Sequence, residues 1–186
     1  GPVNIPASKS GMTLTSQYPE FPGRTQLDGR IIPGYEPPDP TLTLDGCDDT
    51  VCVSGLNIIL GNCGVEIKNS ATCILSSCVI DDNIAYNRER GGGVTIRGRS
   101  APLILGNTIA VNEAKGAGGG VRVDGSGGVL ANNTIQGNRV PVGGEGGGMY
   151  LRNTLPSLVI ADNVIQENKS AFPCPICNPD VDDWDG

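Results

Sequence analysis

The chain has 186 residues, of which 28 are glycine and only 4% are aromatic; this composition fits a backbone with many turns and excludes a helix bundle. The formal net charge of −7 argues against a nucleic-acid partner, because nucleic-acid binding relies on clustered lysine and arginine. No apolar run approaches the roughly 20 residues that a membrane-spanning helix needs, so we expect no membrane insertion.

A repeated motif runs through most of the chain, in which a glycine-rich step leads into a short alternating strand. Glycine triplets begin at positions 91, 118 and 146, which are 27 and 28 residues apart. The strands predicted after them are Val94–Ile96, Val121–Val123 and Met149–Leu151, with weaker copies at Leu42–Leu44 and Val65–Ile67 and one further candidate at Met12–Leu14. Stacked copies would place like residues in one buried column, made of Val65, Val94, Val121 and Met149.

Each of these strands is followed by two more apolar segments. In the third segment an isoleucine recurs at positions 58, 80, 109, 135 and 165. Three short strands per 22 to 30 residues cannot bury their inward faces alone, but stacked copies can. We therefore predict an all-β chain that folds as a parallel β-helix, a solenoid of about five to six coils with three short strands per coil.

An asparagine closes each third strand, at Asn83, Asn112, Asn138 and Asn168. An amide is both donor and acceptor, so amides stacked about 4.8 Å apart can bond to one another and fix the register of the coils. A glycine- and asparagine-rich loop region or a β-sandwich is disfavoured, because the three features recur in the same order four times. A leucine-rich repeat is disfavoured because its L-x-x-L-x-L spacing is absent.

We expect one domain over residues 1–186. It comprises an irregular first coil over 1–38, regular coils over 39–171, and a loop over 172–186 that leads to a missing next coil. An uncapped last coil would present unpaired backbone and apolar edges. The expectation is therefore a fragment of a longer protein, or a chain that docks on a partner or on its own copies through the solenoid ends.

Cysteines and aspartates raise the question of disulfides and metals. The seven cysteines are an odd number, so at least one is free or paired outside the chain. Cys174 and Cys177 lie in a polar, proline-rich stretch and are predicted to form disulfides in an oxidising compartment, with a thiolate zinc site as the alternative. The weak calcium candidates are Asp180, Asp182, Asp183 and Asp185. No other cofactor is expected.

The GGG-V-x-I, Asn-x-Ile and closing-asparagine elements of residues 39–171 resemble the right-handed parallel β-helix repeats of the pectate-lyase-like superfamily. The resemblance implies a right-handed, single-stranded solenoid and an extracellular or cell-surface location. It also implies variable loops before each first strand, here 85–90, 113–117, 139–145 and 169–185. Glycan-processing members of the superfamily work on the outer face of the strand that follows these loops.

The outward residues of the first strands form the predicted ligand-binding strip: Glu66, Lys68, Thr95, Arg97, Arg122, Asp124, Tyr150 and Arg152. Basic and tyrosine side chains on a rigid sheet could bind an acidic polysaccharide. If the chain is an enzyme, the catalytic group would be Arg97, Arg122, Asp124 and Arg152, with an arginine beside a carboxylate serving proton abstraction next to a uronate carbonyl. The same residues also fit a solvated sheet face with cross-strand ion pairs.

Two functions follow from this strip. We favour a non-catalytic module: a structural scaffold, or a unit for glycan binding, protein binding or assembly. The alternative is the catalytic domain, or part of one, of a polysaccharide lyase or hydrolase that acts on acidic glycans. The chain has no histidine, and no two neighbouring carboxylates stand on the strip, which favours the first function.

Overall fold

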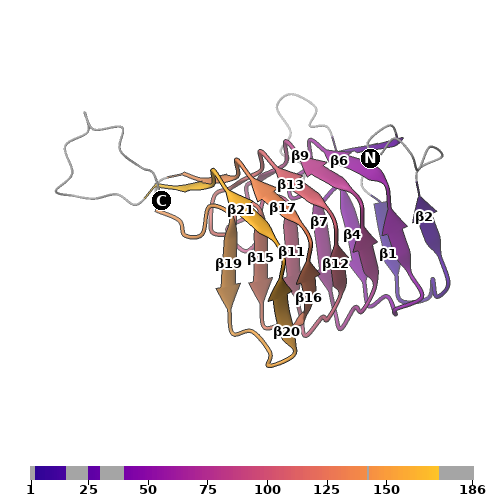
Figure 1. The fold of residues 1–186 in the computed structure, drawn as a ribbon. Helices are drawn as coiled ribbons and strands as arrows, with labels where there is room; N and C mark the ends of the chain where they lie inside the picture. The colour runs from indigo at the N-terminus through magenta and orange to yellow at the C-terminus, as the bar shows by residue number, and fades with distance from the viewer. Residues whose placement is uncertain (1–2, 16–24, 30–39, 142, 172–186) are drawn as a thin grey trace, which may run out of the picture.

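The computed structural model describes residues 3–15, 25–29, 40–141 and 143–171. Within these ranges the strands form four parallel sheets, wound into a solenoid whose coils lie side by side (Figure 1). Three of the sheets have six strands, one from each coil. The predicted all-β parallel β-helix with three strands per coil is therefore confirmed, and six coils are described.

The first strand of every coil belongs to sheet A. Its members are β1 Val3–Pro6, β4 Leu42–Asp45, β7 Val65–Lys68, β11 Val94–Arg97, β15 Val121–Asp124 and β19 Met149–Arg152. Val94 pairs with Val65 on one side and with Val121 on the other, and Val121 pairs with Met149. The predicted first-strand column is therefore confirmed.

The strands of the first coil are assigned to the sheets differently from the sequence prediction. Residues Thr13–Thr15 form β2, which pairs with a second strand, Cys52–Ser54. The first-strand position is taken instead by Val3–Pro6, which pairs with β4. The prediction of a first strand at Met12–Leu14 is wrong, because a lone Thr-Leu-Thr alternation looks the same in any of the three sheets.

Sheets B and C hold the second and third strands. Sheet B consists of β2, β5 Cys52–Ser54, β8 Ile74–Ser76, β12 Leu103–Leu105, β16 Gly128–Ala131 and β20 Leu158–Ala161. Sheet C consists of β3 Thr25–Asp28, β6 Leu56–Ile59, β9 Val79–Asp81, β13 Thr108–Ala110, β17 Thr134–Gln136 and β21 Val164–Gln166. In sheet C the predicted isoleucine column lies in register, running through Ile58, Ile80, Ile109, Ile135 and Ile165.

A fourth, smaller sheet was not predicted. Sheet D contains β10 Ile84–Ala85, β14 Glu113–Ala114, β18 Arg139–Val140 and β22 Lys169–Ser170. These two-residue strands lie at the start of the segments that the resemblance assigned to loops. Three of their side chains pack with the thiol of Cys63 into a second small core, formed by Cys63, Ala85, Ala114 and Val140. The variable segments therefore leave the solenoid from a fixed, hydrogen-bonded edge.

Inward side chains are fully buried in the middle coils because each has a neighbour above and below. In the last described coil the same inward positions are open: Leu151 is 44% exposed, Ile160 39% and Ile165 50%. Burial in this fold is thus supplied by the adjacent coil rather than by the coil itself.

Two ladders of asparagines, buried except in the last described coil, hold the coils in register. The predicted ladder runs from Asn83 through Asn112 and Asn138 to Asn168. At each step the backbone N–H and the Nδ2 of one asparagine both donate to the Oδ1 of the next; for Asn112 both distances to Asn138 are 3.0 Å. A second ladder joins Asn107, Asn133 and Asn163 in the turns between sheets B and C.

The glycine triplets lie where the chain passes close to neighbouring backbone. A Cβ on Gly93 would lie 2.6 Å from the carbonyl oxygen of Gly120 and 2.6 Å from the Cγ2 of Ile109. A Cβ on Gly120 would lie 2.6 Å from the carbonyl oxygen of Gly148. Backbone atoms of the neighbouring coil stand at these contacts, so a side chain at Gly93 or Gly120 would force the coils apart, and the glycines of these triplets mark a close approach of coils.

We expect Asn112→Ala to lower the free energy of unfolding by about 3 kcal/mol, because it leaves buried donors and acceptors of two neighbouring coils unpaired. Urea unfolding followed by circular dichroism measures this change. The matched control is Asn132→Gly, an exposed asparagine with a φ of 57° that glycine adopts freely. A loss of less than about 1 kcal/mol in Asn112→Ala would show that the ladder does not stabilise the fold.

Candidate functional site

The outer face of sheet A is partly covered by the segment 86–93, which precedes β11. Of the predicted ligand-binding strip, Glu66 is 1% exposed, Thr95 is 0% exposed and Arg122 is 7% exposed. These residues do point away from the main core, as expected from the alternation of the strands. The alternative of a solvated sheet face is wrong for these three, because residues of the loop 86–93 lie against them: Arg90 against Glu66, Gly91 against Thr95 and Arg88 against Arg122.

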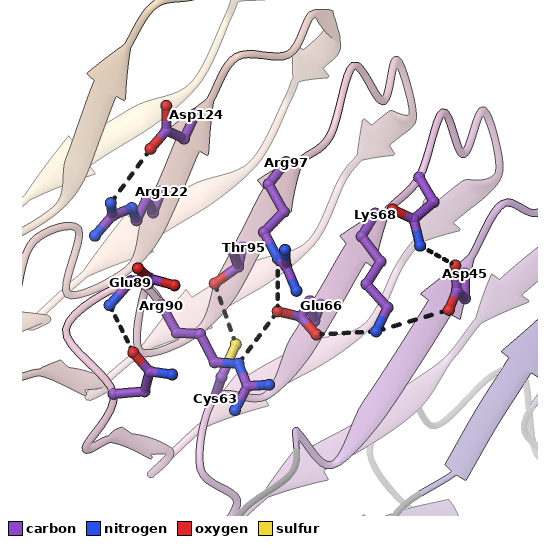
Figure 2. Close-up of polar contacts among 12 residues, drawn as sticks. Asp45, Cys63, Glu66, Lys68, Glu89, Arg90, Thr95, Arg97, Arg122 and Asp124 are labelled. Carbon is purple, nitrogen blue, oxygen red and sulfur yellow. Dashed lines mark hydrogen bonds and ion pairs between the residues drawn. The ribbon is translucent and has the colours of Figure 1, made fainter.

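Glu66 is the centre of an ion-pair network (Figure 2). Its Oε1 accepts a hydrogen bond from the Nε of Arg97 at 2.9 Å and another from the Nε of Arg90 at 3.1 Å. Its Oε2 lies 3.8 Å from the Nζ of Lys68, which in turn lies 3.7 Å from Asp45. Three cations therefore surround one enclosed carboxylate.

This environment keeps Glu66 ionised. Burial on its own would raise the pKa of Glu66, but the hydrogen bond from Arg97 and the charge and hydrogen bond of Arg90 outweigh it. The pKa of Glu66 consequently lies below its ordinary value. A buried charge of this kind is tolerated only because it is paired and hydrogen-bonded.

Thr95 fastens the loop before β11 to the sheet. Its Oγ1 accepts a hydrogen bond from the backbone N–H of Gly91 at 2.8 Å and lies 3.4 Å from the Sγ of Cys63. Burial raises the pKa of the Cys63 thiol to about 12, so this thiol stays protonated. Thr95 and Cys63 are enclosed structural groups and do not offer a surface to a large ligand.

Arg122 is held by both the loop and its own strand. Its Nη1 donates to the carbonyl oxygen of Arg88 at 2.7 Å, and its Nη2 donates to the Oδ2 of Asp124 at 3.3 Å. The guanidinium carbon lies 5.5 Å from the centre of the Tyr150 ring, within the range of a cation–π contact. The guanidinium plane is therefore fixed, and its Nε makes no hydrogen bond within the described part of the chain.

The exposed part of the strip lines a pocket of about 380 Å³, which we call the arginine pocket. Its lining residues are Glu89, Arg97, Gly98, Arg122, Asp124 and Arg152. A second pocket of about 270 Å³ adjoins it and shares Arg122 and Arg152, with Tyr150 among its other lining residues. Guanidinium groups donate to carboxylates in pairs, and carboxylates accept from sugar hydroxyls, so the arginine pocket can bind an anionic, hydroxylated molecule.

The structure thus brings together four of the eight predicted strip residues: Arg97, Arg122, Asp124 and Arg152. Tyr150 lines the adjoining pocket, whereas Glu66, Lys68 and Thr95 do not line either one. Sequence reasoning missed Glu89 and Arg90, which come from the loop. The charged run Arg88-Glu89-Arg90 directly before a glycine triplet was the available signal.

Metals and disulfides have little support in the described residues. There, no group of three or more Cys, Asp or Glu side chains is placed to hold a metal ion. The five cysteines within the described ranges are all free thiols: Cys47, Cys52, Cys63, Cys73 and Cys78. The disulfide candidates Cys174 and Cys177 and the calcium candidates Asp180, Asp182, Asp183 and Asp185 lie outside the described residues. In the same described ranges there is no helix with the length and apolar character to span a bilayer.

A family model described as a right-handed beta-helix region matches residues 42–174 of the chain. Comparisons with curated proteins and with solved structures found no match. The matched range contains both asparagine ladders, the three glycine triplets and every residue that lines the arginine pocket.

Thiol labelling tests the burial of the cysteines. Burial raises the pKa of Cys73 to about 12 and that of Cys78 to about 11, and only the thiolate reacts with iodoacetamide. We expect peptide mapping at pH 8 to find Cys63, Cys73 and Cys78 unlabelled in the native protein and labelled in urea. Equal labelling rates in both conditions would contradict the enclosed core.

The ion-pair network makes stability depend on pH. Because the pKa of Glu66 is lower in the folded than in the unfolded chain, its contribution is present above the unfolded pKa of about 4.3 and is lost as the pH falls through the folded pKa. We expect Glu66→Gln to be less stable than the native protein by about 3 kcal/mol at pH 7.

Urea unfolding between pH 3 and pH 7 should show this difference shrinking toward acidic pH. Glu167→Gln, at an exposed glutamate, is the control and should follow the native protein throughout. A difference that stays constant with pH would mean that the charge of Glu66 does not stabilise the fold.

Proposed function

This chain belongs to the right-handed beta-helix family, and we propose that it is an extracellular or cell-surface module that binds an acidic polysaccharide without cleaving it. The observation that carries the proposal is the arginine pocket, where Arg97, Arg122 and Arg152 converge from three successive strands of sheet A. The extracellular location rests on the resemblance of the repeat to glycan-processing β-helix proteins.

Charge distribution supports this proposal. The chain as a whole is acidic, with a formal net charge of −7, so a cluster of three arginines is not a consequence of composition. Arg97 and Arg152 lie on strands separated by one intervening strand, a distance of about 10 Å at the usual strand spacing. A polymer with repeated carboxylates can therefore meet more than one guanidinium at a time.

The surroundings of the pocket favour binding over catalysis. Glu66 is enclosed and already bonded to two arginines, and Asp124 is paired with Arg122. A general acid or base must reach the proton that it transfers, which the enclosed carboxylate of Glu66 does not. Two carboxylates line the pocket itself: Asp124 is paired with Arg122, and Glu89 is exposed on the loop rather than held on the sheet. The guanidinium groups of Arg97 and Arg122, which hydrogen bonds hold in place, are instead suited to recognition.

Isothermal titration with polygalacturonate tests the proposal, with uncharged dextran as the comparison ligand. We expect binding of the uronate polymer only, weakened by added salt, and a loss of roughly tenfold in affinity for Arg97→Ala and for Arg152→Ala. The matched control is Arg139→Ala, an exposed arginine paired with Glu113 on sheet D, which should bind like the native protein. Absence of binding to any uronate polymer would overturn the proposal.

The same samples decide between binding and cleavage. Incubation with uronate polymers, with and without calcium, is followed by the ultraviolet absorbance of unsaturated products. We expect no increase for the native protein. Product formation by the native protein that is lost in Arg122→Ala would overturn the proposed binding function and show that the chain is a polysaccharide lyase.

A further inference from the structure

We propose that Glu66 is a positioning residue for the arginine pocket, an inference that rests on the proposed anion binding. Glu66 does not line the pocket, and its side chain is only 1% exposed. It is nevertheless bonded to one arginine that lines the pocket and to another that belongs to the loop bordering it. The enclosed carboxylate therefore acts on the ligand through other residues.

The first link runs directly to Arg97. The carboxylate of Glu66 accepts from the Nε of Arg97 at 2.9 Å, while the side chain of Arg97 stays 45% exposed. A guanidinium has five donors in one plane. Bonding of the Nε to Glu66 fixes that plane and leaves the terminal Nη groups for a ligand in the pocket.

The second link runs through the loop before β11. Glu66 accepts from the Nε of Arg90 at 3.1 Å and so ties residues 86–93 to the sheet (Figure 2). Within this loop the backbone N–H of Arg90 donates to the carbonyl oxygen of Asn87 at 3.1 Å, which closes a tight turn. The carbonyl oxygen of Arg88, in the same turn, accepts from Arg122 at 2.7 Å.

Glu66 on β7 thereby holds two of the three arginines of the pocket, one on β11 and one on β15. Arginine side chains lose considerable rotamer entropy when a ligand immobilises them. Arginines that are already immobilised by Glu66 and by the loop bind an anion without that loss. The network is thus a means of preorganising a binding surface built from long, flexible side chains.

Titration of Glu66→Gln with polygalacturonate tests this role, because the two explanations predict opposite changes in affinity. Removal of a negative charge near an anion site should strengthen binding by simple electrostatics. Loss of positioning should instead weaken it, and we expect affinity to fall about fivefold. Asp162→Asn is the charge-matched control, since Asp162 lies in an exposed turn between sheets B and C, and it should bind like the native protein or slightly more tightly. Unchanged or tighter binding by Glu66→Gln overturns the inference.

A second readout needs no ligand. Nitrogen-15 NMR of the arginine side chains reports the Nε–H of Arg97, which should be protected from solvent exchange in the native protein and lose that protection in Glu66→Gln. Unchanged protection overturns the positioning role of Glu66, whether or not the native protein binds a uronate polymer. Absence of binding by the native protein would by itself overturn only the proposed function. If Glu66→Gln does not fold, Arg90→Gln cuts the loop link alone and should lower the affinity by the same mechanism.

Discussion

Parallel stacking of like residues on adjacent coils is the interaction on which every other feature of this structure depends. A single coil has no core of its own, and its inward residues are buried only by the coils on either side. The asparagine ladders fix the register of this packing, because a shift of one coil by one residue against the next would leave buried amides unpaired. Isoleucines fill the interior, amides set the alignment, and glycines allow the close approach.

The features with a recurring side-chain signature could be read from the sequence, whereas very short or isolated strands could not. The column through Ile109 and the ladder through Asn112 recur at near-constant spacing, so their stacking followed from periodicity alone. Sheet D was missed because a two-residue strand has no period to detect. Sequence reasoning also could not distinguish which sheet a lone strand such as Thr13–Thr15 joins, because that depends on the turn before it.

The predicted ligand strip shows the same limit at the level of single side chains. Alternation along the first strands correctly separated inward from outward residues, so Arg97 and Arg152 were found on the outer face. The burial of Glu66 was not predictable, since it depends on Arg90, a loop residue 24 positions away. Whether the outer face of sheet A forms a pocket or a plain surface is therefore determined by the loop segments that precede its strands.

Those segments differ in length while the solenoid beneath them does not change. The stretches 86–93 and 115–120, and the described residues of 141–148, each lie between a short strand of sheet D and the next strand of sheet A. At both ends of a stretch the backbone is anchored, by a sheet D strand that follows a ladder asparagine at its departure and by a crowded glycine at its return. Insertions, deletions or new charges in such a stretch can reshape what the outer face recognises without disturbing coil register, so this architecture allows specificity to diverge independently of folding.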